Sequence, residues 1–330
     1  MQFDVFGIEN PLIDLLVQVP DAKLAELGVE KNKMYLIDQE RLQTVFGALE
    51  DVHILPEPGG SCANTLIGIA QLGGKTAYCG MVGGDEYGRI YIEKLEQAGV
   101  SSYIAADGHL TGSTIILVTP DAARTMNTFL GACQDLTARH VPLDALRASR
   151  MLYITGYLWD TPGQQEAATL ALETAGKAEL PIAMSLSDPF CVDRHQQDFK
   201  RILKDHVDLV FANREEALAL TETDNAQEAM RQLRDWCDAA CITLGSHGAL
   251  VSAGAETVYL DPFDVKAVDT TGAGDAFAAG FLSGRAKGQS LLQCGRLGSY
   301  FAAQVIRQMG PRLAGDVRGR LAPVLDDPRG

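Results

Sequence analysis

A carboxylate that closely follows two glycines is the most informative feature of this 330-residue sequence. Residues 269–277 read Asp-Thr-Thr-Gly-Ala-Gly-Asp-Ala-Phe, and the apolar pattern after Asp275 is that of a helix. Gly272, Ala273 and Gly274 are therefore expected at a helix N-terminus, where free N–H groups and the helix dipole favour an anion. Asp275 would then accept the proton of a hydroxyl that attacks a phosphoryl group held there. An acidic residue in a first helical turn is also common for structural reasons alone.

Two more stretches carry polar groups suited to a ligand. Residues 58–65, Pro-Gly-Gly-Ser-Cys-Ala-Asn-Thr, precede an expected helix, so Gly59 and Gly60 would permit a close approach to the backbone. Asn64 can both donate and accept hydrogen bonds. Asp14 closes the loop that follows the first expected strand, which is the expected position for a site loop. The alternatives are an ordinary turn before a helix and an aspartate that faces solvent.

Short apolar runs alternate with amphipathic stretches and must position these residues. The expected strands are residues 3–8, 75–82, 150–155, 181–186, 207–211 and 239–244. The expected helices are residues 61–72, 86–98, 162–178, 192–204, 214–221 and 225–238. The alternation predicts an α/β fold with three α/β/α layers and a mainly parallel central sheet. Ligands of such sheets bind outside the carboxyl ends of the strands.

Two groups of expected strands lack crossover helices. The first group is 14–19 with 34–38, and the second is 100–106 with 113–119 and 124–128. They predict a small β-sheet lid, formed by segments of about 14–38 and 100–128 within a single domain over residues 1–330. An extension of the main sheet is the alternative. Residues 311–330 are expected to wrap the surface or fray.

Composition narrows the class of protein. With 28 Lys and Arg against 43 Asp and Glu, the net charge of −15 argues against non-specific binding of nucleic acid. The start lacks a secretory signal, and no window reaches the roughly 18 apolar residues of a membrane span. The seven cysteines lack metal-ligand spacing, so reduced thiols and a cytoplasmic location are expected. Neither a G-x-x-x-x-G-K-[ST] nor a dinucleotide-binding fingerprint is present.

The stretches 269–277 and 58–65 resemble the two signatures of the ribokinase/PfkB family of carbohydrate and nucleoside kinases. The resemblance covers residues 7 to about 310 and implies a ribokinase-like fold. It implies that Asp275 is the catalytic base, that residues 272–274 form the anion hole, and that the glycine pair, Asn64 and Asp14 contact sugar hydroxyls.

The first loop looks most like that of adenosine kinase-like members. It reads Asn-Pro-Leu-Ile-Asp from Asn10, which adds Asn10 to the implied substrate residues. The Ser-Cys-Ala sequence at 61–63 departs from the adenosine kinase pattern, and this leaves the preferred base open.

The resemblance also implies a site for ATP and Mg²⁺. Asn213 and Glu216 fit an N-x-x-E element near the metal, with Glu216 acting through water; an Asn-capped helix start is the competing interpretation. Thr243, Gly245 and Gly248 lie in a stretch similar to the nucleotide-binding turn of the family.

Three further residues have roles implied by the family. Arg124 lies in a segment that resembles the one bearing a phosphate-contacting arginine, and Arg suits such charge; an exposed strand arginine is the alternative. Asp269 and Thr271 are implied in a monovalent-cation site for K⁺, a feature that varies among adenosine kinase-like members.

A wall for a nucleobase is expected from apolar residues near the site. Tyr157 follows a strand and could stack on a purine, although such aromatics are often plain core. Leu130 is also expected to contact the substrate on this wall. The remaining candidates are Leu16, Met34, Leu36, Ala132 and Trp159.

The sequence thus predicts an ATP-dependent kinase that phosphorylates the 5′-hydroxyl of a ribonucleoside, with adenosine as the first choice. The alternatives are a ribokinase- or fructokinase-type sugar kinase, an inosine or guanosine kinase, and a non-catalytic nucleoside-binding protein. Retention of Asp275 with its glycines argues against the last of these. The expected partners are small molecules, and both a monomer and a homodimer remain open.

Overall fold

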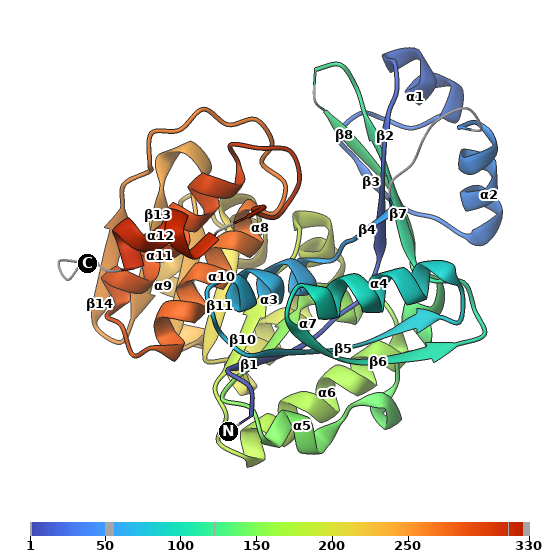
Figure 1. The fold of residues 1–330 in the computed structure, drawn as a ribbon. Coiled ribbons are helices and arrows are strands. Elements are labelled where there is room, and N and C mark those ends of the chain that lie inside the picture. The colour runs from blue at the N-terminus through green and yellow to red at the C-terminus, as the bar shows by residue number, and fades with distance from the viewer. Residues whose placement is uncertain (1, 50–55, 122, 316, 326–330) are drawn as a thin grey trace.

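Nine strands form the sheet that organises most of the chain. The computed structural model describes residues 2–49, 56–121, 123–315 and 317–325 (Figure 1). The strand order is β14-β13-β12-β11-β10-β9-β1-β5-β6. The strands are β1 (Val5–Ile8), β5 (Thr76–Gly83), β6 (Val100–Asp107), β9 (Leu152–Thr155), β10 (Ile182–Ser185), β11 (Leu209–Asn213), β12 (Ala239–Thr243), β13 (Ala249–Ala253) and β14 (Glu256–Leu260). From β6 to β12 every pair is parallel, and β13 and β14 are antiparallel.

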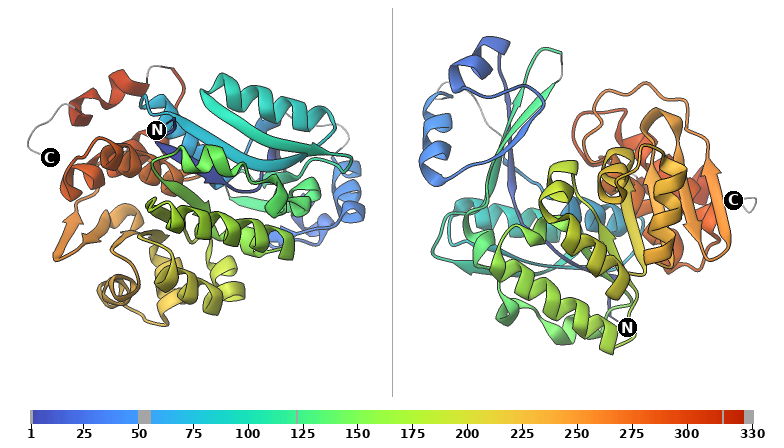
Figure 2. Two further views of the ribbon diagram at one scale, coloured as in Figure 1. Left: turned by 90° about the horizontal axis from the view of Figure 1, so that it is seen from below. Right: turned by 180° about the vertical axis from the view of Figure 1, so that it is seen from behind.

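Helices cover both faces of this sheet (Figure 2). On one face lie α3 (Ser61–Gln71), α4 (Glu86–Gln97), α10 (Ala273–Ala286) and α11 (Leu291–Val305). On the other lie α5 (Leu143–Arg147), α6 (Pro162–Lys177), α7 (Pro189–Asp205), α8 (Arg214–Thr221) and α9 (Ala226–Trp236). The parallel strands are buried on both faces, which explains their continuous apolar runs. The predicted three-layer α/β fold is confirmed.

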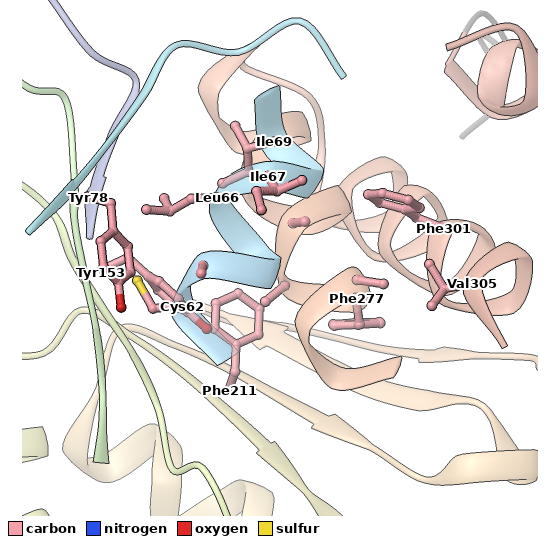
Figure 3. Packing of buried hydrophobic residues seen from close by; sticks show 14 of the residues in the cluster. Cys62, Leu66, Ile67, Ile69, Tyr78, Tyr153, Phe211, Phe277, Phe301 and Val305 are labelled. Carbon is pink, nitrogen blue, oxygen red and sulfur yellow. The ribbon is translucent and has the colours of Figure 1, made fainter. Parts of the chain in front are cut away.

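Two core layers follow from the alternation of side chains along each strand. Tyr153 and Phe211 point toward α3 and α10, whereas Leu152 and Ile154 belong to the layer on the other face. Figure 3 shows Phe211 facing Phe277 of α10, with ring centroids 6.4 Å apart.

Helices α3 and α10 pack closely because small residues lie between them. A Cβ added at Gly68 would lie 2.7 Å from the Cβ of Ala279. The two helices carry the N-terminal and C-terminal motifs respectively, so this contact fixes the motifs relative to each other.

A second sheet of five strands stands at one end of the large one (Figure 1), in the order β3-β8-β7-β2-β4. Its strands are β2 (Ile13–Gln18), β3 (Met34–Leu36), β4 (Pro56–Pro58), β7 (Ser113–Val118) and β8 (Arg124–Phe129). One face packs against α1 (Asp21–Leu27) and α2 (Gln39–Gly47) through a continuous apolar cluster. The opposite face carries Asp14, Ile116, Arg124 and Thr128 and is turned toward a cavity.

Two expectations from the sequence need correction. Residues 100–106 do not join the small sheet; they form β6, which pairs in parallel with β5 at the edge of the large sheet. Helix α4 is the crossover that makes this parallel return possible. The C-terminal segment does not simply wrap the surface: Leu313 is buried and α12 (Val317–Leu325) packs on α11. Residues 326–330 lie outside the described part of the chain.

Within the described residues, no helix is both long enough and apolar enough to cross a lipid bilayer.

Candidate active site

A cavity of about 610 Å³ lies between the small sheet and the carboxyl ends of the central strands. Strand β1 lies between β5 and β9, so the strand order reverses direction at β1. Ligands of open α/β sheets bind at such a topological switch point. The lining includes Asp14 and Arg124 from the small sheet, Asn64 from α3, and Asp275 from α10. Residues far apart in the sequence therefore meet here, as predicted.

The N-terminus of α10 opens onto this cavity. Gly272 caps the helix with φ 72°, in the left-handed region, and a Cβ there would lie 2.5 Å from Pro311. Gly272, Ala273 and Gly274 all line the cavity. The first turn of a helix has N–H groups without intrahelical partners, so this end can receive a phosphoryl group.

Asp275 is held in place by two side chains of α3. Ser61 Oγ donates to Asp275 Oδ1 at 2.6 Å, and Asn64 Nδ2 donates to Asp275 Oδ2 at 2.8 Å. Burial raises the pKa of Asp275 to about 6, and the two hydrogen bonds and Arg312 oppose that rise. A carboxylate with this pKa is largely ionised at neutral pH yet basic enough to take a proton.

Arg312 is a site residue that the sequence reasoning missed. Its Nε donates to Asn64 Oδ1 at 2.8 Å, and its Nη2 donates to the carbonyl oxygen of Pro58. Asn64 thus bridges Arg312 and Asp275, and its amide orientation is fixed from both ends. The half-buried guanidinium also opposes the rise that burial causes in the pKa values of Asp14 and Asp275.

Asp14 lies next to the glycine pair. A Cβ at Gly59 would lie 2.3 Å from Asp14 Oδ1, so only glycine leaves room for this carboxylate. Burial raises the pKa of Asp14 to about 7, with Arg312 and Arg124 opposing the rise. Gly60 caps α3 with φ 95° and lines the cavity. Gly59 lies outside the lining, and its lack of a side chain leaves room for the Asp14 carboxylate.

Glu9 is a second residue missed from the sequence. The residue is 1% exposed and lines the cavity, and its Oε2 accepts the Cys62 N–H at 3.0 Å. Oε1 has no hydrogen-bond partner among the described residues. Burial raises the pKa of Glu9 to about 8. The neighbouring Asn10 also lines the cavity and accepts a hydrogen bond from Gln164.

Arg124 joins the small sheet to the loop before α10. Its Nη2 donates to Asp269 Oδ2 at 2.5 Å, and this ion pair is largely shielded from solvent. The same oxygen accepts the Gly310 N–H at 2.8 Å, and Asp269 Oδ1 accepts the Thr271 N–H at 3.0 Å. Both carboxylate oxygens of Asp269 are therefore engaged. Thr271 lines the cavity.

The residues expected near ATP lie at the ends of β11 and β12. Asn213 and Glu216 line the cavity and form a capping box at the start of α8, as the competing interpretation proposed. Burial raises the pKa of Glu216 to about 7. Thr243 and Gly245 also line the cavity.

Gly248 lies outside that lining. It has φ 86°, and a Cβ there would lie 1.9 Å from the Leu260 carbonyl oxygen, so turn geometry accounts for the glycine.

An apolar wall completes the cavity. Tyr157 and Leu130 line it, as expected for the substrate residues. Met34 and Leu36 join them, together with Met126 and Phe190, which were not expected. Of the other candidates, Leu16, Ala132 and Trp159 lie outside the lining; Trp159 is buried and its ring meets Phe199 edge-on.

An anion-accepting helix end beside a shielded base suits one class of reaction, the transfer of a phosphoryl group to a hydroxyl group. The protein is a phosphotransferase of that class. It belongs to the pfkB family of carbohydrate kinases, whose family model matches residues 34–316.

Individual relatives cover nearly the whole chain. A probable sugar kinase from Rhizobium etli has 37% sequence identity and a TM-score of 0.91, covering 98% of this chain and 99% of its own. The adenosine kinase from Sinorhizobium meliloti has 37% identity and a TM-score of 0.90 over the same shares. The adenosine kinase of Saccharomyces cerevisiae is 29% identical over 326 residues, 92% of this chain and 94% of that protein. This similarity confirms the resemblance deduced from the two motifs.

Proposed function

We propose that this protein transfers the γ-phosphoryl group of ATP to the 5′-hydroxyl of a ribonucleoside, with adenosine as the acceptor. The observation that carries the proposal is Asp275 at the open N-terminus of α10, hydrogen-bonded to Ser61 and Asn64. The adenosine kinases among the relatives support the choice of acceptor.

The apolar wall favours a base-bearing acceptor over a free sugar. Met34, Leu36, Leu130 and Tyr157 offer an area that a nucleobase would cover and a monosaccharide would leave exposed to water. Tyr157 lines this wall, and we propose that its ring would contact a purine. A sugar kinase, or an inosine or guanosine kinase, is the competing assignment that the acceptor experiment below must address.

Each polar residue then has a role in one reaction. Asp14 and Asn64 would hold the ribose hydroxyls, and Asn10 and Gly60 would complete that end of the site. Asp275 would take the proton of the 5′-hydroxyl as its oxygen attacks the γ-phosphorus in line.

The charge that develops on the transferring group would be held at the other end of the cavity. The N–H groups at residues 272–274 and the Arg124 guanidinium would receive it. Closure of the small sheet over the cavity would exclude water and reduce wasteful hydrolysis of ATP.

Kinases of this family use ATP with a divalent metal ion, and we propose Mg²⁺ here. The metal would neutralise charge on the ATP phosphates. Glu216 fits a role through water, because its carboxylate lines the cavity and Mg²⁺ keeps several waters. Asn213 orients this carboxylate through its N–H at 2.9 Å. Thr243 and Gly245 would contact the nucleotide.

The described residues fit K⁺ less well. A cation bound by the Asp269 carboxylate would have to displace Arg124, which already supplies a positive charge at that position. Thr271 offers its hydroxyl, but its N–H is committed to Asp269. No step of the proposed mechanism depends on a monovalent cation.

The acceptor can be identified by measuring ATP consumption with Mg²⁺ across adenosine, inosine, guanosine, cytidine, ribose and fructose, with the product identified by mass. Turnover on adenosine, lost in Asp275→Ala, would support the proposal. Turnover on a free sugar alone would retain the reaction and overturn the acceptor, and no turnover with any acceptor would favour a binding protein. Light scattering on the same sample would decide between monomer and homodimer.

A further inference from the structure

A cluster of three metal-ligating side chains lies at the wall of the cavity, which Asp160 lines, apart from the residues proposed for phosphoryl transfer. Ligand atoms of Asp160, Cys191 and His195 all lie within 4.8 Å of one another. Asp160 follows the short 3₁₀ helix η3 (Gly156–Trp159), and the other two residues come from α7. Carboxylate, thiolate and imidazole are the ligand types that zinc binds in proteins.

The backbone places these side chains together. Cys191 and His195 are four residues apart, so they share one face of α7. Helical geometry breaks at His195, with φ −122° and ψ 20°. This break accompanies the contact of His195 Nε2 with Asp160 Oδ1 at 2.9 Å.

The cluster is shielded from solvent. The Asp160 side chain is 5% exposed and the His195 side chain 16%, and Cys191 is buried. Cys237 donates its thiol hydrogen to the Leu203 carbonyl oxygen at 3.6 Å, whereas Cys191 Sγ makes no hydrogen bond with any described residue. A buried thiol without a hydrogen bond, next to an imidazole and a carboxylate, is free to serve as a ligand.

Arg194 is the competitor for Asp160. Its Nη2 lies 2.8 Å from Oδ1 and 3.1 Å from Oδ2 of that carboxylate. Asp160 therefore already has a cationic partner when no metal is bound. The Arg194 side chain is 35% exposed, so the guanidinium can turn into solvent and leave Oδ1 to another cation.

We propose that Asp160, Cys191 and His195 form a binding site for one zinc-class divalent ion, with water as the fourth ligand. Ligand atoms around one Zn²⁺ lie about 3.3–3.8 Å apart, so small side-chain rotations complete the site. Binding releases the Cys191 thiol proton to solvent as the thiolate–metal bond forms. The soft thiolate separates this site from the oxygen-lined region suited to Mg²⁺.

A metal ion bound at this site would connect two segments that line the same cavity wall, η3 and the start of α7. Tyr157 lies on η3, just before Asp160 in the sequence, and Phe190 precedes Cys191 on α7. A metal bridge between them would rigidify the wall without contacting a reacting atom. The proposal stands on the cluster itself and does not depend on the identity of the phosphoryl acceptor.

The test is a titration of the purified 330-residue protein, kept reduced, with Co²⁺ and with Zn²⁺. We expect one Co²⁺ per chain with a sulfur-to-cobalt charge-transfer band, displacement of Co²⁺ by Zn²⁺, and a higher thermal midpoint with Zn²⁺. His195→Gln should weaken binding at least about 10-fold, and Cys191→Ser should abolish the charge-transfer band. Cys237→Ser is the matched control and should bind as the wild type does.

Arg194→Gln provides a test with the opposite sign. Removing the competing guanidinium should tighten metal binding, whereas a purely structural Asp160–Arg194 pair would predict lost stability and no gain in affinity. A missing charge-transfer band in the wild type would overturn the proposal. So would binding that is equal in Cys191→Ser, His195→Gln and Cys237→Ser, since that pattern indicates an adventitious ion only. If Cys191→Ser fails to fold, the metal affinity of His195→Gln still tests the site, because the His195 side chain is partly exposed.

Discussion

Asn64 Nδ2 donates a hydrogen bond of 2.8 Å to Asp275 Oδ2, although the two residues are 211 positions apart in the sequence. One residue belongs to the glycine-pair motif on α3 and the other to the anion-accepting end of α10. The packing of these two helices therefore sets the distance between the residue proposed to bind sugar hydroxyls and the proposed base. Positioning of this kind supplies a large part of the rate enhancement in phosphoryl transfer.

The first prediction concerns the pH dependence of activity. Since Asp275 must be ionised to act and its pKa is raised to about 6, kcat/KM should rise with pH through about 6 and then level off. Ser61→Ala removes a hydrogen bond that lowers this pKa, so the acid limb should move to higher pH. Ser101→Ala, at an exposed position on β6, is the control. An unchanged limb in Ser61→Ala would contradict the assignment.

Arg312 should prove essential to the site. Arg312→Gln removes the donors to Asn64 and Pro58 and a charge that lowers the pKa values of Asp14 and Asp275. A hydrogen bond to a charged group is worth about 1.5–3 kcal/mol, so kcat/KM should fall about 10- to 100-fold, with an acid limb at higher pH. Arg320→Gln, exposed on α12, should change neither quantity. Steady-state kinetics across pH would show which behaviour occurs.

The burial of Glu9 leads to a prediction about how the free energy of unfolding depends on pH. Its pKa rises from 4.5 in the ordinary case to about 8 on burial, so the folded state resists its ionisation. The contribution of Glu9 to stability is therefore full below pH about 4.5 and is lost progressively as the pH rises toward 8. Each pKa unit corresponds to about 1.4 kcal/mol.

Glu9→Gln keeps an acceptor for the Cys62 N–H and stays neutral at every pH. Urea unfolding should show the variant gaining at least about 1 kcal/mol on the wild type between pH 5 and pH 8. A parallel pH dependence of the two proteins would mean that Glu9 is not neutral in the folded state.

Activity should not require K⁺. Asp269 already has Arg124, Gly310 N and Thr271 N as partners. Initial rates measured at equal ionic strength in potassium and in tetramethylammonium salts should agree within about twofold, on the basis that the internal guanidinium supplies the charge. A strong requirement for K⁺ would show that a cation binds there in spite of this ion pair.

Much of the fold could be predicted because the strands are short, apolar and separated by amphipathic helices. One exception was β6, because its pairing depends on the crossover through α4 and the segment alone does not reveal its partner. Asp275, Asn64 and Asp14 could be predicted because each belongs to a motif with distinctive spacing. Their convergence on one cavity follows from the rule that ligands bind at the carboxyl ends of parallel strands.

Arg312 and Glu9 could not be found in the same way. Arg312 reaches the site from a segment that reads as a surface tail, and the packing of Pro311 against Gly272 and the burial of Leu313 hold that segment inward. Glu9 precedes the expected Asn10 and carries no spacing of its own; its role depends on being buried against the N–H of Cys62. Both residues belong to the site because of contacts in the folded protein, which no local sequence pattern indicates.

The most direct test of the mechanism is the turnover number of Asp275→Ala with ATP, Mg²⁺ and the acceptor found for the wild type, with circular dichroism to verify the fold. Asp264→Ala, at an exposed position away from the cavity, is the control. The mechanism predicts that Asp275→Ala folds normally and loses roughly 10²- to 10⁴-fold in kcat, as expected for a missing general base. A well-folded Asp275→Ala protein with near-normal turnover would remove Asp275 from that role.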